Sequence, residues 1–211
     1  MNREYILASG NKGKLREINT VLKPLGFVVR PQSDWQVPEA AETASTFVEN
    51  SLLKARQAAR YTGLPSIADD SGLVVPVLNG QPGIYSARYA GDAADDQANI
   101  EKLLAELLGR TGAERQAYFF CALVLLRSAD DPAPLIATGR WYGQILESPR
   151  GGGGFGYDPV FGIPTLTNPD RQTSAAELTP AQKSQLSHRG LALMDLVRQL
   201  ECIELDGRIA E

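Results

Sequence analysis

The sequence predicts a mixed α/β fold in which helices flank a long twisted mixed β-sheet. Amphipathic helix patterns alternate with short strand patterns in the first half of the 211 residues, and two long apolar strand patterns follow in the second half. No internal repeat or interdomain linker interrupts the chain. We therefore expect a single domain over residues 1–211, folded as one compact unit with a central cleft.

The first elements follow from hydrophobic periodicity. Residues 5–8 are predicted as a strand and residues 12–23 as a helix that ends at Pro24, because proline cannot continue a helix from within. Residues 27–30 are predicted as a second strand.

The middle of the chain contains two helix patterns and two short strand patterns. A capping-box pattern at 46–49 opens a helix that closes at 63–65, and an amphipathic helix is predicted over 95–108. Residues 66–68 and 73–78 are predicted as separate strands, with a turn-forming Asp-Asp-Ser-Gly between them.

The second half is dominated by one long apolar run. Residues 117–126 are predicted as the central strand, because ten consecutive apolar residues suit a strand covered on both faces. Residues 135–146 are its expected hairpin partner, and the glycine run at 150–156 is predicted to be irregular. A capping box at 179–182 precedes the last amphipathic helix.

Composition limits the possible classes of function. A net charge of −4 argues against a general nucleic-acid-binding surface, so we expect small-molecule partners. No run of about 18 apolar residues predicts a membrane span, and no signal-peptide core is present, so a cytoplasmic location is expected. The two cysteines lie far apart and His188 is the single histidine, so any metal must be bound by oxygen.

The adjacent carboxylates Asp69 and Asp70 are the first candidate site. At a strand end, both could reach a cleft and bind Mg²⁺, which prefers carboxylate oxygens, waters and substrate phosphates. The alternative is an Asx-turn, in which both acids hydrogen-bond local backbone.

A second candidate lies between the first strand and the first helix. It consists of Ser9, Gly10, Asn11, Lys12, Gly13 and Lys14. Glycines let backbone amides approach an anion, and a helix N-terminus favours negative charge, so this segment is a candidate phosphate-binding loop. It lacks the spacing of a Walker A loop, and an ordinary structural turn is the alternative.

Further candidates lie on the second helix and in the loop before it. Lys54 shares a helix face with Asn50, and its alternative interpretation is an ordinary solvated lysine. Glu39 and Glu42 are candidate metal-binding or water-positioning carboxylates, and solvated loop glutamates are the alternative.

The segment Phe155, Gly156, Tyr157 and Asp158 combines two aromatic rings with an acid that can accept hydrogen bonds, as in a nucleobase slot. Downstream, three potential donors lie near the start of the last helix: Lys183, His188 and Arg189. They could hold a base carbonyl or phosphates, although a solvated helix cap is the alternative.

Taken together, six blocks resemble the inosine/xanthosine triphosphate pyrophosphatase family. They are Ser9-Gly10-Asn11-x-Gly-Lys14, Phe47-Val48-Glu49-Asn50-x3-Lys54, Ala68-Asp69-Asp70-Ser71-Gly72-Leu73, the segment from Pro82 to Tyr89, Phe155-Gly156-Tyr157-Asp158-Pro159, and Ser187-His188-Arg189. These blocks cover nearly the whole chain in the order found in the family.

The resemblance implies a Mg²⁺-dependent, homodimeric hydrolase of ITP, dITP or XTP that cleaves between the α- and β-phosphates and releases a monophosphate and pyrophosphate. It implies that the segment from Ser9 to Lys14, together with Lys54, holds the triphosphate. Asp70 would be the general base, Ser71 would touch substrate, and the segment from Phe155 to Asp158 would form the base pocket with Lys183, His188 and Arg189. The expected metal ligands are Asp70, Glu42 and Asp69.

Two departures from the family pattern affect the site. The family often has adjacent glutamates where this chain keeps only Glu42, and residues 165–173 look like an insertion beside the base pocket.

The alternative function is a non-catalytic protein that binds purine nucleotides and regulates other processes. Two adjacent carboxylates favour the enzyme, because a pure binder gains little from negative charge beside a triphosphate.

Overall fold

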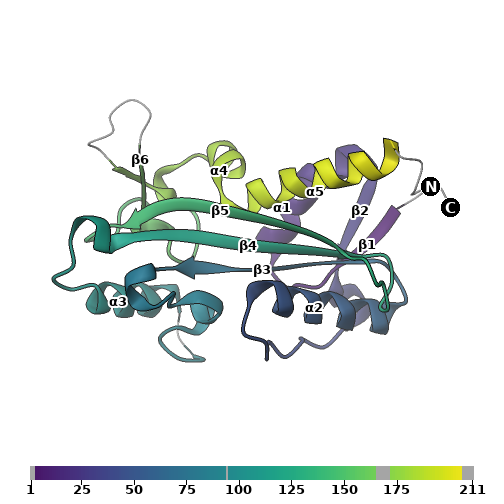
Figure 1. Ribbon diagram of the computed structural model, residues 1–211, viewed down its shortest axis with the longest axis horizontal. Coiled ribbons are helices and arrows are strands. Elements are labelled where there is room, and N and C mark those ends of the chain that lie inside the picture. Colours follow the sequence, from purple (N-terminus) through teal and green to yellow (C-terminus); the bar gives the residue numbers. More distant parts are fainter. Residues whose placement is uncertain (1–2, 94, 165–171, 206–211) are drawn as a thin grey trace. The chain divides into compact units, whose positions relative to one another are not determined.

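The computed structural model describes residues 3–93, 95–164 and 172–205 (Figure 1). The chain is a mixed α/β protein, as predicted. Its strands are β1 Arg3–Leu7, β2 Phe27–Pro31, β3 Ser66–Val74, β4 Gln116–Leu126, β5 Leu135–Ile145, β6 Phe161–Pro164 and β7 Gln172–Ser174. Its helices are α1 Lys12–Leu22, α2 Phe47–Thr62, α3 Asp96–Glu106, α4 Pro180–Leu186 and α5 His188–Leu205. Among these residues, no helix is long and apolar enough to cross a membrane.

The strands form one sheet in the order β2-β1-β3-β4-β5-β6-β7. β1 runs parallel to β2 and β3, whereas β6 runs antiparallel to β5 and β7, so the sheet is mixed. β4 has three strands on either side, which confirms the prediction that the long apolar run is the central strand.

The chain divides into two compact units. Unit 1 contains the described residues among 1–70, 121–139 and 189–211, and unit 2 contains those among 71–120 and 140–188. Strands β3, β4 and β5 each contribute residues to both units. The single domain and the central cleft stay predictions.

Unit 1 has a hydrophobic cluster on each face of its part of the sheet. On one face, α1 and α5 pack against alternate strand residues such as Leu7, Ile67 and Cys121. On the other face, α2 packs against the residues between them, including Ile6 and Ala68 (Figure 1). Odd-numbered residues of β3 in this unit therefore face α5, and even-numbered residues face α2.

The described residues of unit 2 include a hydrophobic cluster. Side chains of α3 pack with aromatic residues of its strands, including Phe119, Trp141 and Phe161. The ring centroids of Phe119 and Phe161 lie 4.6 Å apart at a tilt of 57°, an arrangement that aromatic pairs favour.

The prediction of two strands separated by an Asp-Asp-Ser-Gly turn was wrong. β3 runs continuously from Ser66 to Val74, so Asp69 and Asp70 lie inside a strand and do not form an Asx-turn. Beyond the strand, Pro76–Leu78 forms a 3₁₀ turn with proline in its first positions, because proline lacks the amide that a strand would use.

Smaller differences concern the ends of elements. The first helix, predicted over 12–23, ends at Leu22, and a 3₁₀ turn, Lys23–Leu25, that contains Pro24 follows it. The helix predicted over 95–108 ends at Glu106, and Leu108, beyond this end, is 86% exposed. The predicted last helix is two helices, and its capping box at Thr179 starts the shorter one, α4.

Candidate functional site

Asp69 and Asp70 lie on opposite faces of β3. Asp69 is 0% exposed and follows the alternation that turns Ile67 toward α1 and α5, whereas Asp70 is 7% exposed and follows Ala68 toward α2. The expectation that both carboxylates reach one cleft from a strand end was wrong, because successive side chains in a strand point to opposite faces.

Asp69 is the centre of a buried ion-pair network. Its carboxylate accepts a hydrogen bond from Arg189 Nε at 3.0 Å, forms an ion pair with Lys14, and lies 3.4 Å from the Cys121 thiol. Burial alone would raise the pKa of Asp69, but Arg189 and Lys14 outweigh burial and hold this pKa well below its ordinary value. Asp69 therefore stays an anion that anchors two cations.

Arg189 is 2% exposed and is the second residue of α5, which begins at His188. Its Nη1 also donates to Glu17 Oε2 at 2.8 Å, so the guanidinium joins α1, β3 and α5 within unit 1. Sequence reasoning missed Glu17, because a single acid on an amphipathic helix is typical of a solvated face.

Asp70, Lys54 and Glu42 form a second charged group. Lys54 Nζ donates to Asp70 Oδ1 at 2.8 Å and to Glu42 Oε1 at 2.9 Å, and its side chain is only 13% exposed. The solvated-lysine alternative is therefore wrong. Burial raises the pKa of Asp70 above its ordinary value despite the neighbouring ammonium. A raised pKa makes the Asp70 carboxylate a stronger base.

The first turn of α2 also fixes the loop that carries Glu42. Asn50 is fully buried, and its side-chain amide accepts from Ala44 N at 3.0 Å and donates to Ala44 O at 3.4 Å. Thr46 caps the helix through Glu49 N at 3.2 Å. The helix that supplies Lys54 therefore also positions Glu42 beside it.

The donor set around Asp70 fits a hard divalent cation. Asp70 Oδ2 is buried and has no hydrogen-bond partner among the described residues, whereas Oδ1 binds Lys54. Mg²⁺ is usually bound by one or two carboxylates plus waters and phosphate oxygens, which Asp70 and Glu42 can supply. Within the part of the chain that the structure describes, no group of three or more metal-binding side chains is present.

A polar pocket of about 160 Å³ lies beside this group in unit 1. Ser9 and Gly10 line one part of it, and both lysines, Lys14 and Lys54, also line it. Glu39 lines the same pocket as Glu42, and Glu42 forms an ion pair with Lys54. Two ammonium groups and two carboxylates around one small pocket suit a phosphate accompanied by a cation.

The segment from Ser9 to Lys14 leads directly into α1. Asn11 is the N-cap, and its Oδ1 accepts from Gly13 N at 2.8 Å and Lys14 N at 3.1 Å. Two first-turn amides are therefore engaged by Asn11. Lys12 lines a neighbouring cavity of about 490 Å³, which also contains Ser9 and Gly10.

In unit 2, Asp158 organises the predicted nucleobase slot. Its carboxylate is 3% exposed, accepts from Phe155 N at 2.8 Å and forms a short ion pair with Lys183. The Lys183 ammonium lies 4.6 Å from the centre of the Phe155 ring, a cation–π distance. Gly154 has φ +77°, and a Cβ atom there would overlap the carboxylate. This glycine is therefore required for close packing.

Gly156 and Tyr157, the other two residues of the predicted nucleobase slot, each donate a hydrogen bond to another segment. Gly156 N donates to Asp96 Oδ2 at 2.6 Å, and the Tyr157 hydroxyl donates to Ser86 O at 2.9 Å. His188 stacks on Phe119 with centroids 4.8 Å apart and a tilt of 14°. Phe155 is 46% exposed, so its ring is accessible.

The structure thus places the predicted residues in two groups. Those from Ser9 to Lys14, with Glu42, Lys54, Asp69, Asp70 and Arg189, belong to unit 1, and Ser71, Phe155, Gly156, Tyr157, Asp158, Lys183 and His188 belong to unit 2. Most of the predicted insertion, residues 165–171, lies outside the described residues.

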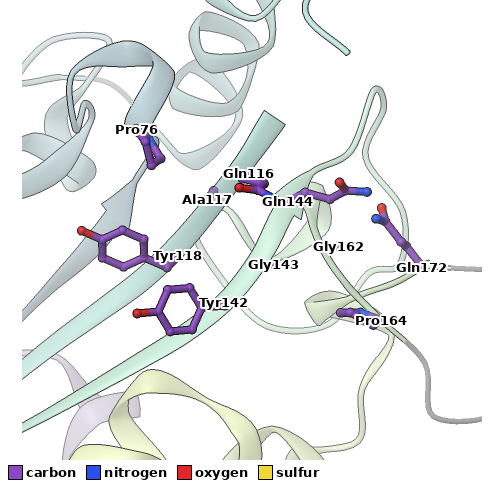
Figure 2. Close-up of a pocket in the computed structure, with 10 residues that line it drawn as sticks. All are labelled: Pro76, Gln116, Ala117, Tyr118, Tyr142, Gly143, Gln144, Gly162, Pro164 and Gln172. Carbon is purple, nitrogen blue, oxygen red and sulfur yellow. The ribbon is translucent and has the colours of Figure 1, made fainter. Parts of the chain in front are cut away.

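Another pocket in unit 2, of about 440 Å³, contains none of the predicted site residues (Figure 2). The rings of Tyr118 and Tyr142 lie side by side on neighbouring strands, with centroids 5.5 Å apart. Three glutamines, Gln116, Gln144 and Gln172, supply carboxamides on its other side. None of the described residues that line this pocket is charged, so this lining does not suit a polyanion.

Comparison with known proteins gives one consistent result. The model of the Ham1 family matches residues 5–199. A dITP/XTP pyrophosphatase of Vibrio cholerae is 52% identical over 199 residues, covering 94% of this chain and 97% of the Vibrio protein. A dITP/XTP pyrophosphatase of Thioalkalivibrio sulfidiphilus is 53% identical over 198 residues, covering 94% and 98%.

Comparison with solved structures gives the same result as comparison with sequences. A HAM1 protein from Coxiella burnetii matches with a TM-score of 0.85 and 47% identity, covering 94% of this chain and 98% of that protein. The dITP/XTP pyrophosphatase of Mycobacterium abscessus matches with a TM-score of 0.75 and 40% identity, covering 93% and 99%.

Proposed function

The chain belongs to the Ham1 family, and we propose that it is a hydrolase that removes non-canonical purine nucleoside triphosphates such as ITP, dITP and XTP from the nucleotide pool. The reaction proposed is cleavage between the α- and β-phosphates, which gives the nucleoside monophosphate and pyrophosphate. Relatives that cover nearly the whole chain and carry this activity in their names support the proposal.

One observation in the structure carries the mechanism: the buried carboxylate of Asp70 lies beside the partly buried ammonium of Lys54. The raised pKa of Asp70, caused mainly by burial, suits a group that takes a proton from an attacking water. Lys54 Nζ is placed to balance negative charge brought in by phosphate oxygens.

Asp70 and Glu42 are the residues proposed to hold Mg²⁺, with Asp70 Oδ2 as the available oxygen. When bound, the cation would neutralise phosphate charge and make attack at phosphorus easier. Asp69, predicted as a third ligand, is instead engaged by Arg189 and Lys14, so we assign it an anchoring role.

Triphosphate binding is proposed for the polar pocket of unit 1. Lys14 and Lys54 supply positive charge there, and Ser9 and Gly10 line the pocket. Because Asn11 already satisfies the first-turn amides of Gly13 and Lys14, the lysine side chains carry most of the electrostatic attraction. Lys12 extends the cationic surface into the adjoining cavity.

Base recognition is proposed for the unit 2 group. The Phe155 ring offers a stacking surface, worth about 1–3 kcal/mol per base, and Lys183 can donate to the 6-oxo group that hypoxanthine and xanthine carry and adenine lacks. Asp158 orients Lys183 and the backbone of Phe155. Contacts of Ser71, Gly156, Tyr157, His188 and Arg189 with substrate also remain part of the proposal.

We also propose that the protein forms a homodimer and that it is located in the cytoplasm. The resemblance to the family supports the dimer, and two free thiols, Cys121 and Cys202, are compatible with a reducing compartment.

A substrate panel tests the proposed function. The protein is incubated with ITP, dITP, XTP and ATP in the presence of Mg²⁺, and pyrophosphate and inorganic phosphate are measured separately. We expect pyrophosphate from the first three and little product from ATP. Tight binding of ITP without turnover would favour the regulatory alternative, and release of inorganic phosphate would contradict cleavage between the α- and β-phosphates.

A further inference from the structure

One segment of the family resemblance, Pro82 to Tyr89, has no assigned role in the proposed reaction. Its residues Gly83–Arg88 form a 3₁₀ helix, η4, in unit 2. Ser86 within it contacts two separate segments, one through its side chain and one through its backbone. A residue with this pair of contacts can transmit the position of one segment to the other.

The side-chain contact is to β3. Ser86 Oγ accepts from Leu73 N at 2.9 Å and donates to Gly83 O at 2.6 Å. The register of β1 with β3 extends only over Ser66 and Ile67, so the Leu73 amide lies beyond it and requires another partner. Ser86 Oγ supplies this partner. Leu73 lies two residues after Ser71, so the contact is close to Ser71 along β3.

The backbone contact is to the nucleobase slot. The hydroxyl of Tyr157, which is 4% exposed, donates to Ser86 O at 2.9 Å. A buried phenol that lost this acceptor would be left unsatisfied, so the contact holds Tyr157 in place. Tyr157 lies between Phe155 and Asp158, the two residues that shape the proposed stacking surface.

Helix α3 fixes η4 from a third side. Asn99 Nδ2 donates to Ala87 O at 3.2 Å, and Asn99 Oδ1 accepts from Ala90 N at 2.8 Å. The same helix contributes Asp96, which accepts from Gly156 N. The 3₁₀ helix is therefore a supported element and not a free loop.

We propose that Ser86 is a positioning residue that couples the Ser71 segment of β3 to the base-binding residues Phe155 to Asp158. The proposal deepens the proposed function and rests on it. Through this coupling, Ser86 contributes to selection of the base as well as to the rate.

The test compares four variants with the wild-type enzyme: Ser86→Ala, Ser86→Thr, Tyr157→Phe and the double variant Ser86→Ala/Tyr157→Phe. Ser148→Ala, at an exposed loop position, is the matched control. The measurements are kcat and KM for ITP and GTP, with melting temperatures recorded in parallel.

We expect Ser86→Ala and Tyr157→Phe each to lower kcat/KM for ITP by roughly 2- to 10-fold, the range for one hydrogen bond. Both should lower the ratio of kcat/KM for ITP over GTP. The double variant should lose little more than the worse single variant, because both changes break one connection. Ser86→Thr keeps the hydroxyl and should keep wild-type selectivity.

Three results would overturn the proposal: wild-type selectivity in Ser86→Ala, a double variant whose loss is the product of the two single losses, or a lowered melting temperature with unchanged kinetics. If wild-type protein releases no pyrophosphate from ITP or any other panel substrate, the proposed function itself fails, which is a separate outcome.

Discussion

Asp69 and Asp70 are adjacent in β3, yet one carboxylate binds Arg189 and the other binds Lys54 on the opposite face of the sheet. The two environments shift the pKa values in opposite directions: ion pairs lower the pKa of Asp69 despite burial, and burial raises that of Asp70. We therefore propose different roles for the two acids: Asp69 anchors Lys14 and Arg189, and Asp70 takes part in proton transfer.

Replacing Asp70 with asparagine should remove most turnover. The amide keeps the shape of the side chain but cannot accept a proton, so kcat for ITP should fall by at least about 100-fold. Pyrophosphate release measures the effect, and circular dichroism checks the fold. Asp130→Asn, at an exposed aspartate, is the control and should retain wild-type activity. Activity near that of the control in Asp70→Asn would remove Asp70 from the mechanism.

Replacing Asp69 with asparagine should mainly reduce stability. The change leaves Arg189 and Lys14 without their shared carboxylate, and breaking a buried ion pair in this way costs about 3–5 kcal/mol. Urea unfolding at neutral pH measures the loss. An unchanged unfolding midpoint would contradict the anchoring role.

The stability difference between wild type and Asp69→Asn should also depend on pH. Because the pKa of Asp69 is lowered in the fold, its stabilisation is fully present above the ordinary pKa of about 3.9 and is lost as pH falls below that value. The difference in unfolding free energy between wild type and Asp69→Asn should therefore be constant from about pH 7 to pH 5 and shrink below about pH 4. A difference that grows on acidification would reverse the assigned shift.

The pKa of Asp70 should respond to Mg²⁺. Without a cation, burial places this pKa above its ordinary value, and a bound cation stabilises the carboxylate and lowers the pKa. Side-chain NMR titration of wild type, with Asp70→Asn used to assign the signal, measures both values. A pKa that does not move with Mg²⁺ would remove Asp70 from the metal site.

Replacing Lys54 with alanine should weaken triphosphate binding more than monophosphate binding. The change removes a positive charge from the polar pocket and leaves Asp70 and Glu42 without their common partner. Binding of ITP and IMP by calorimetry, with Lys23→Ala at an exposed position as control, tests this. Equal losses for the two ligands would contradict a phosphate role.

Hydrophobic periodicity was sufficient to predict most helices and strands. The apolar run of β4 and the capping of α2 are local signals, because strand burial and helix capping depend on neighbouring residues. The continuity of β3 was not predictable in this way. Aspartate, serine and glycine disfavour strands locally, and here partners distant in sequence, Arg189 and Lys54, satisfy the acids within the strand.

In the site, too, local sequence patterns identified candidate residues, whereas the contacts of these residues depend on segments distant in the sequence. Sequence spacing identified Lys54 and Asp70 as candidates, but their ion pair depends on how α2 packs against β3. The ion pair of Asp158 with Lys183 was not predictable from the sequence either, because the two residues are 25 positions apart and β6 and β7 lie between them. β6 and β7, which are short, left no periodic signal.

The dependence of pyrophosphate release from ITP on Mg²⁺ tests the central claim most directly. With wild-type protein, the rate should rise with Mg²⁺ concentration, vanish in the presence of a chelator and return when excess Mg²⁺ is restored. An undiminished rate with the chelator present would contradict a mechanism in which Asp70 and Glu42 hold a divalent cation against the substrate phosphates.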